Sequence, residues 1–567
     1  MALFPWTNNN LRQPDEQIPY SRPKFKTKPV QPNTPMPATE LFGPPPDRVS
    51  PRVGRGTPAD KAPDPFLGTE RIPASRYTSR DFMTLEWERM WSQVWLMACR
   101  ESDIAKPGTV VPFQIGRDTI LILRQWDDSI RAFYNVCQHR GSRLLPTDGS
   151  QNPTQVSSLK CGFHHWEWDL DGSLRSVPDP ETFPQGIPCN DLALNEVRCA
   201  KWGGWVFICL DPEVESLEEY LENLPEHLNC YRFENLVHQI DRTVTWPCNW
   251  KTAMDIFSET YHVQAVHPQL MGWTEDYHVQ IDTYGRHSRM LVPFYQPSTR
   301  NPDQTSLSPD IANQLANMGI LARDFEGRPA AARRALQKAK RAIEDRAIHL
   351  PYRNLNDEQL TDNYHYTVFP NVAMNIFADY TLMMRMRPHE ADPNQCYCDV
   401  QILVYQDPGN TKKRPVHTVH HEADVSLGDV IDQDAARLRE VQAGLRSGGF
   451  PGLFLGEQER RIRHFHQVLM AYVDFDPAWD GEAALEQTDQ PSTGPMGPAA
   501  DPAYRPAPTP PQQPPVGGPP PSGGPYAAAV PGTPPGGQAA QQPPEGTDPA
   551  HPGFTGTIPG GFLPSDS

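Results

Sequence analysis

Two short segments have the residue types and spacing of metal-binding loops. The first is Cys137-Gln-His139 and the second is Cys161-Gly-Phe-His164, separated by residues 140–160. Each half offers one thiolate and one imidazole, and both halves follow runs typical of β-strands. Zinc accepts such ligands, but zinc fingers usually place a cysteine pair before a histidine pair. The mixed halves therefore predict a metal site with two sulfur and two nitrogen ligands, and zinc remains an alternative occupant.

A second group of candidate ligands lies in the segment from Asn249 to Pro268. Glu259 and His262 are three residues apart, so on a helix they share one face. His262 and His267 are five apart, about 140° on an ideal helix, and can bind one metal only if the helix ends between them. Pro268 disfavours the helical conformation at the residue before it. We therefore expect His267 on the turn just past the helix end.

The third ligand of this second site is predicted from helical periodicity. Non-haem Fe(II) oxygenases use two histidines and one carboxylate. Asp434 falls on the apolar stripe of a predicted helix, Asp429–Arg446, and a buried unpaired carboxylate needs a cation. Asp432 is about 200° further round that helix and faces away. We predict Asp434 as the ligand and keep Asp432 as the alternative.

The elements that position these residues fall into two blocks. A helix over Arg80–Cys99 is predicted to open the folded part, and short β-rich runs then predict a small all-β unit over about residues 100–215. Beyond it, helices and strands occur in separate blocks, which favours an α+β domain. The β-rich runs are Thr109–Phe113, Thr119–Arg124, Arg131–Val136 and Trp205–Leu210; the later helices are Ser216–Leu224, Trp250–Ala265, Ile311–Ile348, Asp429–Arg446 and Glu457–Tyr472, with strands at Tyr380–Arg387 and Cys398–Tyr405.

Proline marks the ends of the folded part. Of 64 prolines in 567 residues, 15 lie in residues 1–65 and 23 in residues 491–567. Such composition cannot bury enough apolar surface to fold. We predict a disordered arm over residues 1–65, folded domains over 66–215 and 216–480, and a disordered Pro/Gly-rich tail over 481–567.

Charge and composition exclude several classes of protein. A formal net charge of -18 argues against binding to nucleic acid, whose partners are strongly basic. The sequence has no run of 18 or more apolar residues, so we predict no membrane span, and the N-terminus lacks the pattern of a secretory signal. Ten cysteines without such a signal predict a cytoplasmic protein with free thiols. A basic helix over Arg328–Arg346 is interpreted as a solvated insertion, with docking of an acidic electron carrier as the alternative.

Together the motifs resemble the large (α) subunit of Rieske non-haem iron aromatic ring-hydroxylating oxygenases, over about residues 70–475. The resemblance covers both Cys/His halves, the Asn-Trp-Lys…Glu-x₂-His-x₄-His segment and the helix of Asp434. Two departures stand out. The long spacing between the halves suggests a surface insertion around Gly149–Thr154, and His165 stands where the family generally has glycine; we interpret His165 as a neighbour of the ligands.

The resemblance implies a Rieske domain followed by a helix-grip (START-like) catalytic domain, usually in trimers and sometimes with small β subunits. It implies that Cys137, His139, Cys161 and His164 hold a [2Fe–2S] cluster, and that His262, His267 and Asp434 hold a mononuclear Fe(II). Glu259 then matches an acid that bridges a cluster histidine and an iron histidine across a subunit boundary. Electrons from NAD(P)H reach the cluster through a separate reductase, with or without a ferredoxin.

The resemblance thus implies an oxidoreductase that uses O₂ to hydroxylate, and in our main hypothesis to dihydroxylate, an aromatic or polycyclic compound in an apolar pocket. The alternative is a Rieske monooxygenase or demethylase acting on a quaternary amine or a methoxy compound. Glu259 bears on this choice, because the family most often has Asp there and Glu occurs in branches acting on non-aromatic substrates. A third hypothesis, an electron carrier or zinc protein without enzymatic activity, conflicts with the second metal site.

Overall fold

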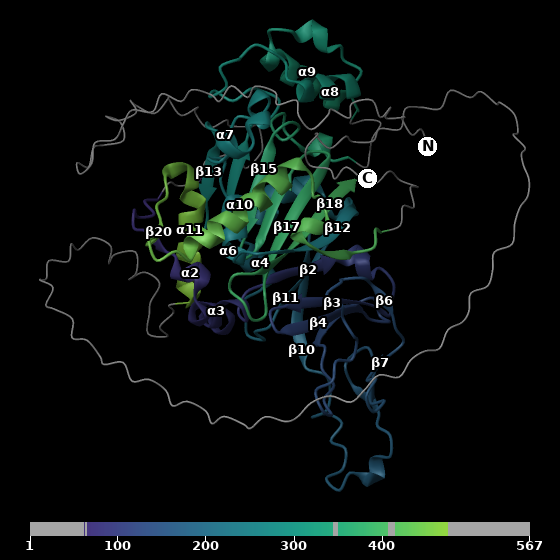
Figure 1. Cartoon of the computed structure of the whole chain (residues 1–567). Helices are drawn as coiled ribbons and strands as arrows, with labels where there is room; N and C mark the ends of the chain where they lie inside the picture. Colours follow the sequence, from purple (N-terminus) through teal and green to yellow (C-terminus); the bar gives the residue numbers. More distant parts are fainter. Residues whose placement is uncertain (1–61, 63–64, 344–349, 406–413, 474–567) are drawn as a thin grey trace, which may run out of the picture. The chain divides into compact units, whose positions relative to one another are not determined.

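The computed structural model describes residue 62 and residues 65–343, 350–405 and 414–473 (Figure 1). The predicted tail over 481–567 lies outside the described residues, and so does the predicted arm over 1–65 apart from residues 62 and 65. The described part contains antiparallel sheets and helices, which confirms the predicted α+β class. None of its helices is both long and apolar enough to cross a membrane.

The first helical segment ends earlier than its sequence pattern predicts. The helix α3 (Arg80–Glu86) and the π-helical turn η1 (Trp87–Trp91) are followed by the strand β2 (Leu96–Arg100). The predicted helix Arg80–Cys99 is therefore wrong at its C-terminal end. All five residues of β2 are buried, and β2 pairs with β11 (Trp205–Cys209). A strand buried on both faces does not alternate in sequence, so periodicity alone cannot separate it from a buried helix.

The N-terminal β domain, residues 96–209, confirms the predicted all-β unit. Its main sheet has seven strands in the order β2-β11-β10-β5-β4-β3-β6, and a smaller sheet has the order β7-β8-β9. The further strands are β3 (Thr109–Ile115), β4 (Asp118–Arg124), β5 (Ile130–Tyr134), β6 (Thr154–Gln155), β7 (Leu159–Lys160), β8 (Glu167–Trp168), β9 (Leu174–Ser176) and β10 (Glu196–Trp202).

The C-terminal domain, residues 217–473, is built on an eight-stranded sheet in the order β13-β14-β15-β16-β17-β18-β12-β19. Neighbouring strands are antiparallel except β12 and β19, which are parallel. The predicted strands Tyr380–Arg387 and Cys398–Tyr405 are confirmed, but the four strands between residues 280 and 376 were not predicted. The strands are β12 (Leu236–Trp246), β13 (Gln280–Thr283), β14 (Ser288–Val292), β15 (Asn363–Val368), β16 (Val372–Ile376), β17 (Tyr380–Pro388), β18 (Cys396–Tyr405) and β19 (Thr418–His421).

Two of the predicted helices are interrupted. Trp250–Ala265 consists of α6 (Trp250–Ile256) and α7 (Val263–Val266), separated by an irregular segment. Ile311–Ile348 contains α8 (Pro309–Asn317) and α9 (Pro329–Ile343), separated by a segment with left-handed glycines. Three other predicted helices occur near their expected places: α4 (Leu217–Leu221), α10 (Asp429–Leu445) and α11 (Arg460–Val473). The short helix α5 (Leu224–Leu228) was not predicted.

The basic helix α9 is not simply a solvated face. Arg333 and Lys340 are buried and form ion pairs with Asp362 and Asp379 respectively. Arg334 and Lys338 are exposed. Part of the positive charge of this insertion is therefore used to dock it on the C-terminal domain.

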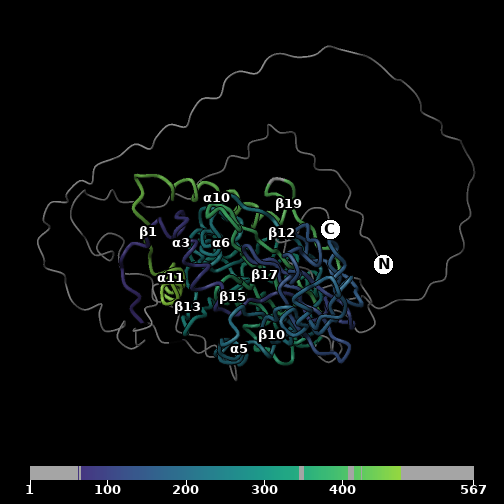
Figure 2. Tube along the Cα trace, turned by 90° about the horizontal axis from the view of Figure 1, so that it is seen from below, coloured from purple at the N-terminus to yellow at the C-terminus, as the bar shows by residue number. Residues whose placement is uncertain are grey.

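The two faces of the large sheet carry different partners. α6 packs on β17, and α10 packs on α6 and β12. Figures 1 and 2 show α10 and α6 over this sheet. The opposite face bears Arg385, Arg387 and Asp399, and the two arginines hydrogen-bond the N-terminal β domain. The sheet thus separates the helices on one face from that domain on the other.

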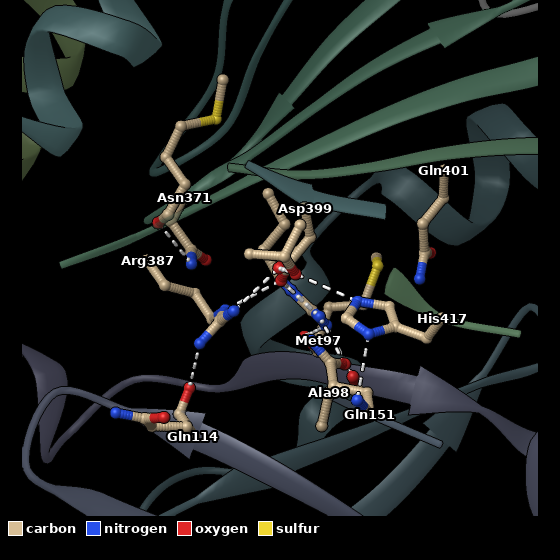
Figure 3. A network of polar contacts seen from close by, with 12 residues as sticks. Met97, Ala98, Gln114, Gln151, Asn371, Arg387, Asp399, Gln401 and His417 are labelled. Atoms are coloured by element: carbon tan, nitrogen blue, oxygen red, sulfur yellow. Dashed lines mark hydrogen bonds and ion pairs between the residues drawn. The ribbon is translucent and has the colours of Figure 1, made fainter. Parts of the chain in front are cut away.

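A buried ionic network joins the two domains. The Asp399 carboxylate accepts hydrogen bonds from Arg385 Nε at 2.7 Å and from Arg387 Nε at 2.8 Å. Arg385 also donates to the carbonyl oxygens of Met97 and Ala98 in β2, and Arg387 donates to that of Gln114 in β3. Figure 3 shows Arg387 and Asp399 reaching from the sheet toward the N-terminal domain.

The longer spacing between the Cys/His halves is used at this interface. Gln151 is buried; its side chain accepts from Arg385, and its backbone N–H donates to His417 Nδ1. The Asn152 side chain pairs with the backbone of His417. The segment around Gly149–Thr154, predicted as a surface insertion, is therefore also a docking loop, with only Gln151 of its residues buried. Sequence spacing reveals an insertion but not the surface against which it packs.

Candidate metal centres

The four residues of the first motif lie on two similar loops of the N-terminal β domain. In the first loop the N–H of Gly141 donates to the carbonyl of Cys137, and in the second the N–H of His165 donates to that of Cys161. Gly141 has φ 76° and His165 has φ 61°, so both loops turn back through the left-handed region. The two cysteine side chains are buried and unbridged.

The left-handed conformation explains why glycine suits position 165. A non-glycine residue adopts positive φ infrequently, although histidine tolerates it better than bulky or β-branched residues. The His165 side chain is exposed. No described contact ties its imidazole to the four motif residues, so its interpretation as a neighbour of the ligands finds no support.

The two motif histidines present unused nitrogen atoms. The rings of His139 and His164 lie with centroids 4.7 Å apart, and His139 stacks on Trp166 at 4.6 Å. Nδ1 of each ring is buried and has no hydrogen-bond partner among the described residues. Buried polar atoms are normally satisfied, so two orphaned nitrogens side by side call for a ligand.

The two sulfurs complete the set. Burial raises the pKa of the Cys137 thiol. Burial would also raise the pKa of Cys161, but the N–H groups of Phe163 and His164 outweigh it and lower that pKa. The Phe163 N–H lies 3.4 Å from the Cys161 sulfur. Two thiols and two free Nδ1 atoms match the Cys₂His₂ donors of a Rieske-type [2Fe–2S] cluster.

The second centre is assembled from two turns and one helix of the C-terminal domain. His262 caps the N-terminus of α7, and His267 follows its last residue with φ -123° and ψ 52°. The expected helix end before Pro268 is therefore confirmed. Asp434 projects from the buried side of α10. One potential ligand atom from each of the three residues lies within 4.8 Å of the others.

The distances direct both imidazoles at the same carboxylate oxygen. Nε2 of His267 is 2.7 Å from Asp434 Oδ1, and Nε2 of His262 is 3.5 Å from it. His262 Nδ1 is 2.6 Å from Glu259 Oε1, and His267 Nδ1 is 2.7 Å from Gln433 Oε1. An acceptor at each Nδ1 fixes the tautomer in which Nε2 is free to bind a metal.

Glu259 reaches His262 in a different way from the one predicted. It lies in the irregular segment after α6, so the two residues do not share a helix face. Instead, Glu259 Oε2 accepts the backbone N–H of His262 at 3.0 Å, like a capping residue. Ser258 and Thr260 also direct their hydroxyls to backbone carbonyls, of Met254 and Asp276. Side chains that hydrogen-bond nearby backbone compete with the helix, which a spacing argument does not register.

The electrostatics of this centre favour a cation. Burial lowers the pKa of His262, but the carboxylates of Glu259 and Asp434 outweigh it and raise the pKa to about 9. The Asp434 side chain is only 3% exposed. A buried carboxylate facing two imidazoles fits the 2-His-1-carboxylate donor set of non-haem iron.

Asp432 faces elsewhere. Its carboxylate accepts the Ser426 hydroxyl at 2.6 Å and the Leu427 N–H at 2.8 Å, on the approach to α10. These contacts assign Asp432 to the start of the helix.

Sequence reasoning missed the residues that support the site. Gln433 holds His267 and also accepts from Gln269, but no periodicity distinguishes it from any other glutamine. Lys251 is fully buried against Glu86 of α3, with Nζ 2.6 Å from Oε1. Asp255 accepts the Tyr77 hydroxyl at 2.6 Å. The partners of Lys251 and Asp255 are remote in sequence, so pattern alone could not pair them.

Comparisons with known protein families follow this division. Residues 94–193 match the Rieske [2Fe–2S] domain, and residues 233–474 match the ring hydroxylating alpha subunit (catalytic domain). The first kind of domain carries a [2Fe–2S] cluster and the second binds mononuclear iron.

Individual relatives include monooxygenases and dioxygenases. The chain is 31% identical over 215 residues to the carnitine monooxygenase oxygenase subunit of Escherichia coli (strain K12), covering 38% of this chain and 55% of the relative. It is 30% identical over 207 residues to the biphenyl 2,3-dioxygenase subunit alpha of Rhodococcus jostii (strain RHA1), covering 34% and 42%. The chain thus spans about half the length of the curated relatives it matches.

The fold agrees with that of a solved quaternary ammonium Rieske monooxygenase. That structure superposes with a TM-score of 0.52 at 18% identity, covering 71% of this chain and 95% of the other. The chain therefore carries a Rieske [2Fe–2S] domain followed by the catalytic domain of ring hydroxylating alpha subunits.

Proposed function

We propose that this protein is the terminal oxygenase component of a Rieske non-haem iron oxygenase. The observation that carries the proposal is the group formed by half-buried His262 with buried His267 and Asp434, in a chain that also has a Cys₂His₂ quartet with unused nitrogen atoms. A protein that only carries electrons has no need of the second metal site. Domain boundaries of 66–215 and 216–480 remain part of the proposal.

The residues of the first quartet are proposed to hold the cluster. Cys137 and Cys161 supply sulfur to one iron, and His139 and His164 supply Nδ1 to the other. Neutral imidazoles in place of two thiolates raise the reduction potential relative to all-cysteine clusters.

His262, His267 and Asp434 are proposed to hold the mononuclear iron, with Glu259 and Gln433 orienting the two rings. When bound, such an iron activates O₂ with electrons delivered through the cluster. Asp434 would offset the charge of the ion, and both Asp434 and His267 are buried.

Electrons are proposed to come from NAD(P)H through a separate reductase, with or without a ferredoxin. The chain has no flavin- or nucleotide-binding fingerprint to serve in their place. We further propose a trimer in which Glu259 joins His262 of one subunit to His164 of the next. The Glu259 side chain is 9% exposed and that of His262 is 18% exposed, so the pair is not closed off within the chain.

Two substrate classes are retained. An aromatic or polycyclic substrate is supported by the matched family and by the biphenyl dioxygenase relative. A quaternary amine is supported by Glu259 in place of the commoner Asp, and by relatives described as carnitine and glycine betaine monooxygenase subunits. Counting the oxygen atoms incorporated from ¹⁸O₂ across a panel of both classes distinguishes dioxygenation from monooxygenation.

The proposal is tested by iron analysis and EPR spectroscopy of the purified protein. We expect two pools of iron and a Rieske-type EPR signal on reduction. Cys137→Ala and His164→Ala should each abolish that signal, whereas Cys189→Ala, which removes an exposed thiol away from the motif, should leave it unchanged. Stoichiometric zinc without an EPR signal would contradict the proposal.

A further inference from the structure

Arg461, near the start of α11, is a fully buried cation that forms no ion pair with the described residues. It is 0% exposed, and no carboxylate of the described residues lies within ion-pair distance of its guanidinium. Asp282 attracts it from further away, but that carboxylate is paired with Arg289 at 2.7 Å. Buried charges are normally paired with an opposite charge. The positive charge of Arg461 has no such ion pair among the described residues.

The contacts of Arg461 are all with neutral groups. Nε donates to the Ser288 hydroxyl at 3.1 Å, and Nη2 donates to the Thr367 hydroxyl at 2.6 Å. Nη1 lies 3.3 Å from the carbonyl oxygen of Ser258 and 3.2 Å from Nδ1 of His365. These contacts hold the guanidinium in place without neutralising it.

The contact with His365 determines the tautomer of that ring. Arginine has only donors, so Nδ1 of His365 must be the acceptor and the single ring proton must lie on Nε2. Burial and the neighbouring Arg461 charge lower the pKa of His365 well below its usual value, which keeps the ring neutral. His365 therefore presents an Nε2–H donor.

That donor has nothing to bind in the described part of the chain. His365 is 2% exposed, and its Nε2 has no hydrogen-bond partner there. Leaving a buried donor unsatisfied costs about 1–3 kcal/mol. A native site that retains such a group calls for an external acceptor.

The register of the sheet places this donor on the face that carries the helices. His365 of β15 is the cross-strand neighbour of Met290 in β14 and of Asn375 in β16. Asn363, two residues earlier on the same face, also has a buried side-chain oxygen without a partner. Through Arg461, His365 is joined to Ser258, the residue directly before Glu259.

We propose that His365, supported by Arg461, forms an anion subsite that anchors a carboxylate of the substrate through Nε2–H. The proposal rests on the proposed oxygenase function and narrows its substrate to compounds that carry an anionic oxygen group. Arg461 is a positioning residue: it sets the tautomer, and its charge compensates the bound carboxylate. A hydrocarbon without polar groups would leave the Nε2–H donor of His365 without an acceptor and the charge of Arg461 without an anion.

The test compares the binding of matched pairs to the reduced, anaerobic holoenzyme by calorimetry. The probes are benzoate with benzamide, and trimethylglycine with its carboxamide. In at least one pair we expect the carboxylate to bind more than tenfold more tightly than the amide, about 1.4 kcal/mol. His365→Phe should reduce this ratio to near one, and His365→Gln, which keeps a donor near the position of Nε2, should retain part of it.

His464→Phe is the matched control, since His464 lies on α11 and its Nε2 contacts the carbonyl of Tyr284 instead. It should leave the ratio unchanged. Arg461→Lys keeps the charge but loses the fork that holds His365, so an intermediate ratio is expected. Iron content and the Rieske signal verify that each variant is folded; if Arg461→Lys fails to fold, the two His365 variants decide.

Equal affinities for carboxylate and amide in both pairs, or a preference that survives His365→Phe, would overturn the subsite. The latter result would place the carboxylate elsewhere, for example on the metal. Oxygen uptake with a reductase separates this outcome from the proposed function. Oxygen uptake without a His365-dependent preference for carboxylates would support the oxygenase function and contradict the subsite. A His365-dependent preference in a protein that takes up no oxygen and has no Rieske signal would support the subsite and contradict the oxygenase function.

Discussion

At the scale of single residues, the second metal centre depends on how each imidazole is held from behind. Glu259 accepts from Nδ1 of His262, and Gln433 accepts from Nδ1 of His267, which leaves both Nε2 atoms facing Asp434. Such outer contacts usually change metal affinity or activity about 10- to 100-fold when they are removed. The ligand atoms and the groups that orient them therefore act as one unit.

Asp434→Ala should remove the mononuclear iron and product formation while leaving the Rieske signal intact, because the two sets of ligands lie in different domains. Loss of the carboxylate leaves two imidazoles without the only described anion that faces both of them. Iron analysis together with EPR of the reduced protein measures both pools.

Asp432→Ala is the matched control for that experiment. It removes an acceptor of the Ser426 hydroxyl and the Leu427 N–H, and should cost about 1 kcal/mol of stability without loss of iron. Iron loss in Asp432→Ala but not in Asp434→Ala would show that the assignment of the third ligand is reversed.

At the scale of secondary-structure elements, neutral buried histidines tie strands to loops. His287, directly before β14, contacts the carbonyl of Tyr220 in α4 through Nε2 at 2.8 Å. Its Nδ1 accepts the N–H of Phe369 at 3.1 Å. Burial lowers the pKa of His287 to about 3, so both contacts are made by the neutral ring.

His287 should therefore make the fold sensitive to acid. In the unfolded chain its pKa is about 6.5, so below that pH the unfolded state binds a proton, whereas the ring remains neutral in the native state. The stabilisation present above pH 6.5 should fall by about 1.4 kcal/mol per pH unit as the pH drops toward 3. Urea unfolding between about pH 6 and 4.5 measures the slope.

His287→Gln keeps a donor and an acceptor but cannot titrate. The pH dependence of its free energy of unfolding should therefore be weaker than that of the wild type, by an amount that corresponds to about one bound proton. Other buried histidines, including His227 with its pKa lowered to about 4, should leave a residual slope in the variant. Identical slopes would show that His287 does not titrate as described.

The strands β17 and β18 carry the ionic network that joins the domains. Burial alone would raise the pKa of Asp399, but Arg387 and Arg385 outweigh it and hold that pKa far below its usual range. Asp399→Asn leaves both guanidiniums without their charge partner, which typically costs about 3–5 kcal/mol for a buried pair. We expect the midpoint of urea unfolding to decrease accordingly.

The exposed ion pair between Arg131 and Glu196 provides the comparison, because its side chains are 34% and 48% exposed. Glu196→Gln should change stability by less than about 1 kcal/mol. If Asp399→Asn were equally mild, the network would not contribute to holding the domains together.

At the scale of the whole molecule, the two metal centres must exchange electrons. Glu259 is hydrogen-bonded to His262, and the proposed trimer brings the other carboxylate oxygen toward His164 of the next subunit. The bridge would then exist only between chains. Its function is therefore a property of the assembly and can be tested without disturbing either set of ligands.

Glu259→Gln should leave both iron pools in place and reduce product formation in a single turnover by more than tenfold, about 1.4 kcal/mol or more of barrier. The amide keeps the size of the side chain but loses the charge and one acceptor. Gln264→Glu, which alters a half-buried position of the same segment, should leave turnover near that of the wild type. Wild-type rates in Glu259→Gln, or full activity in a monomer, would exclude the bridging role.

The sequence by itself determined the features that depend on local spacing. The two Cys/His halves, the helix end before Pro268 and the buried side of the helix around Asp434 follow from spacing, proline stereochemistry and helical periodicity, and all are recovered in the structure. Only the tertiary structure decided which partners these residues meet. The contacts of Gln433 with His267, of Gln151 with Arg385 and of His365 with Arg461 join positions remote in sequence. Burial and hydrogen bonding between distant segments have no period, so no local pattern reports them. In the strand β2, tertiary contacts outweigh the weak local preference for helix.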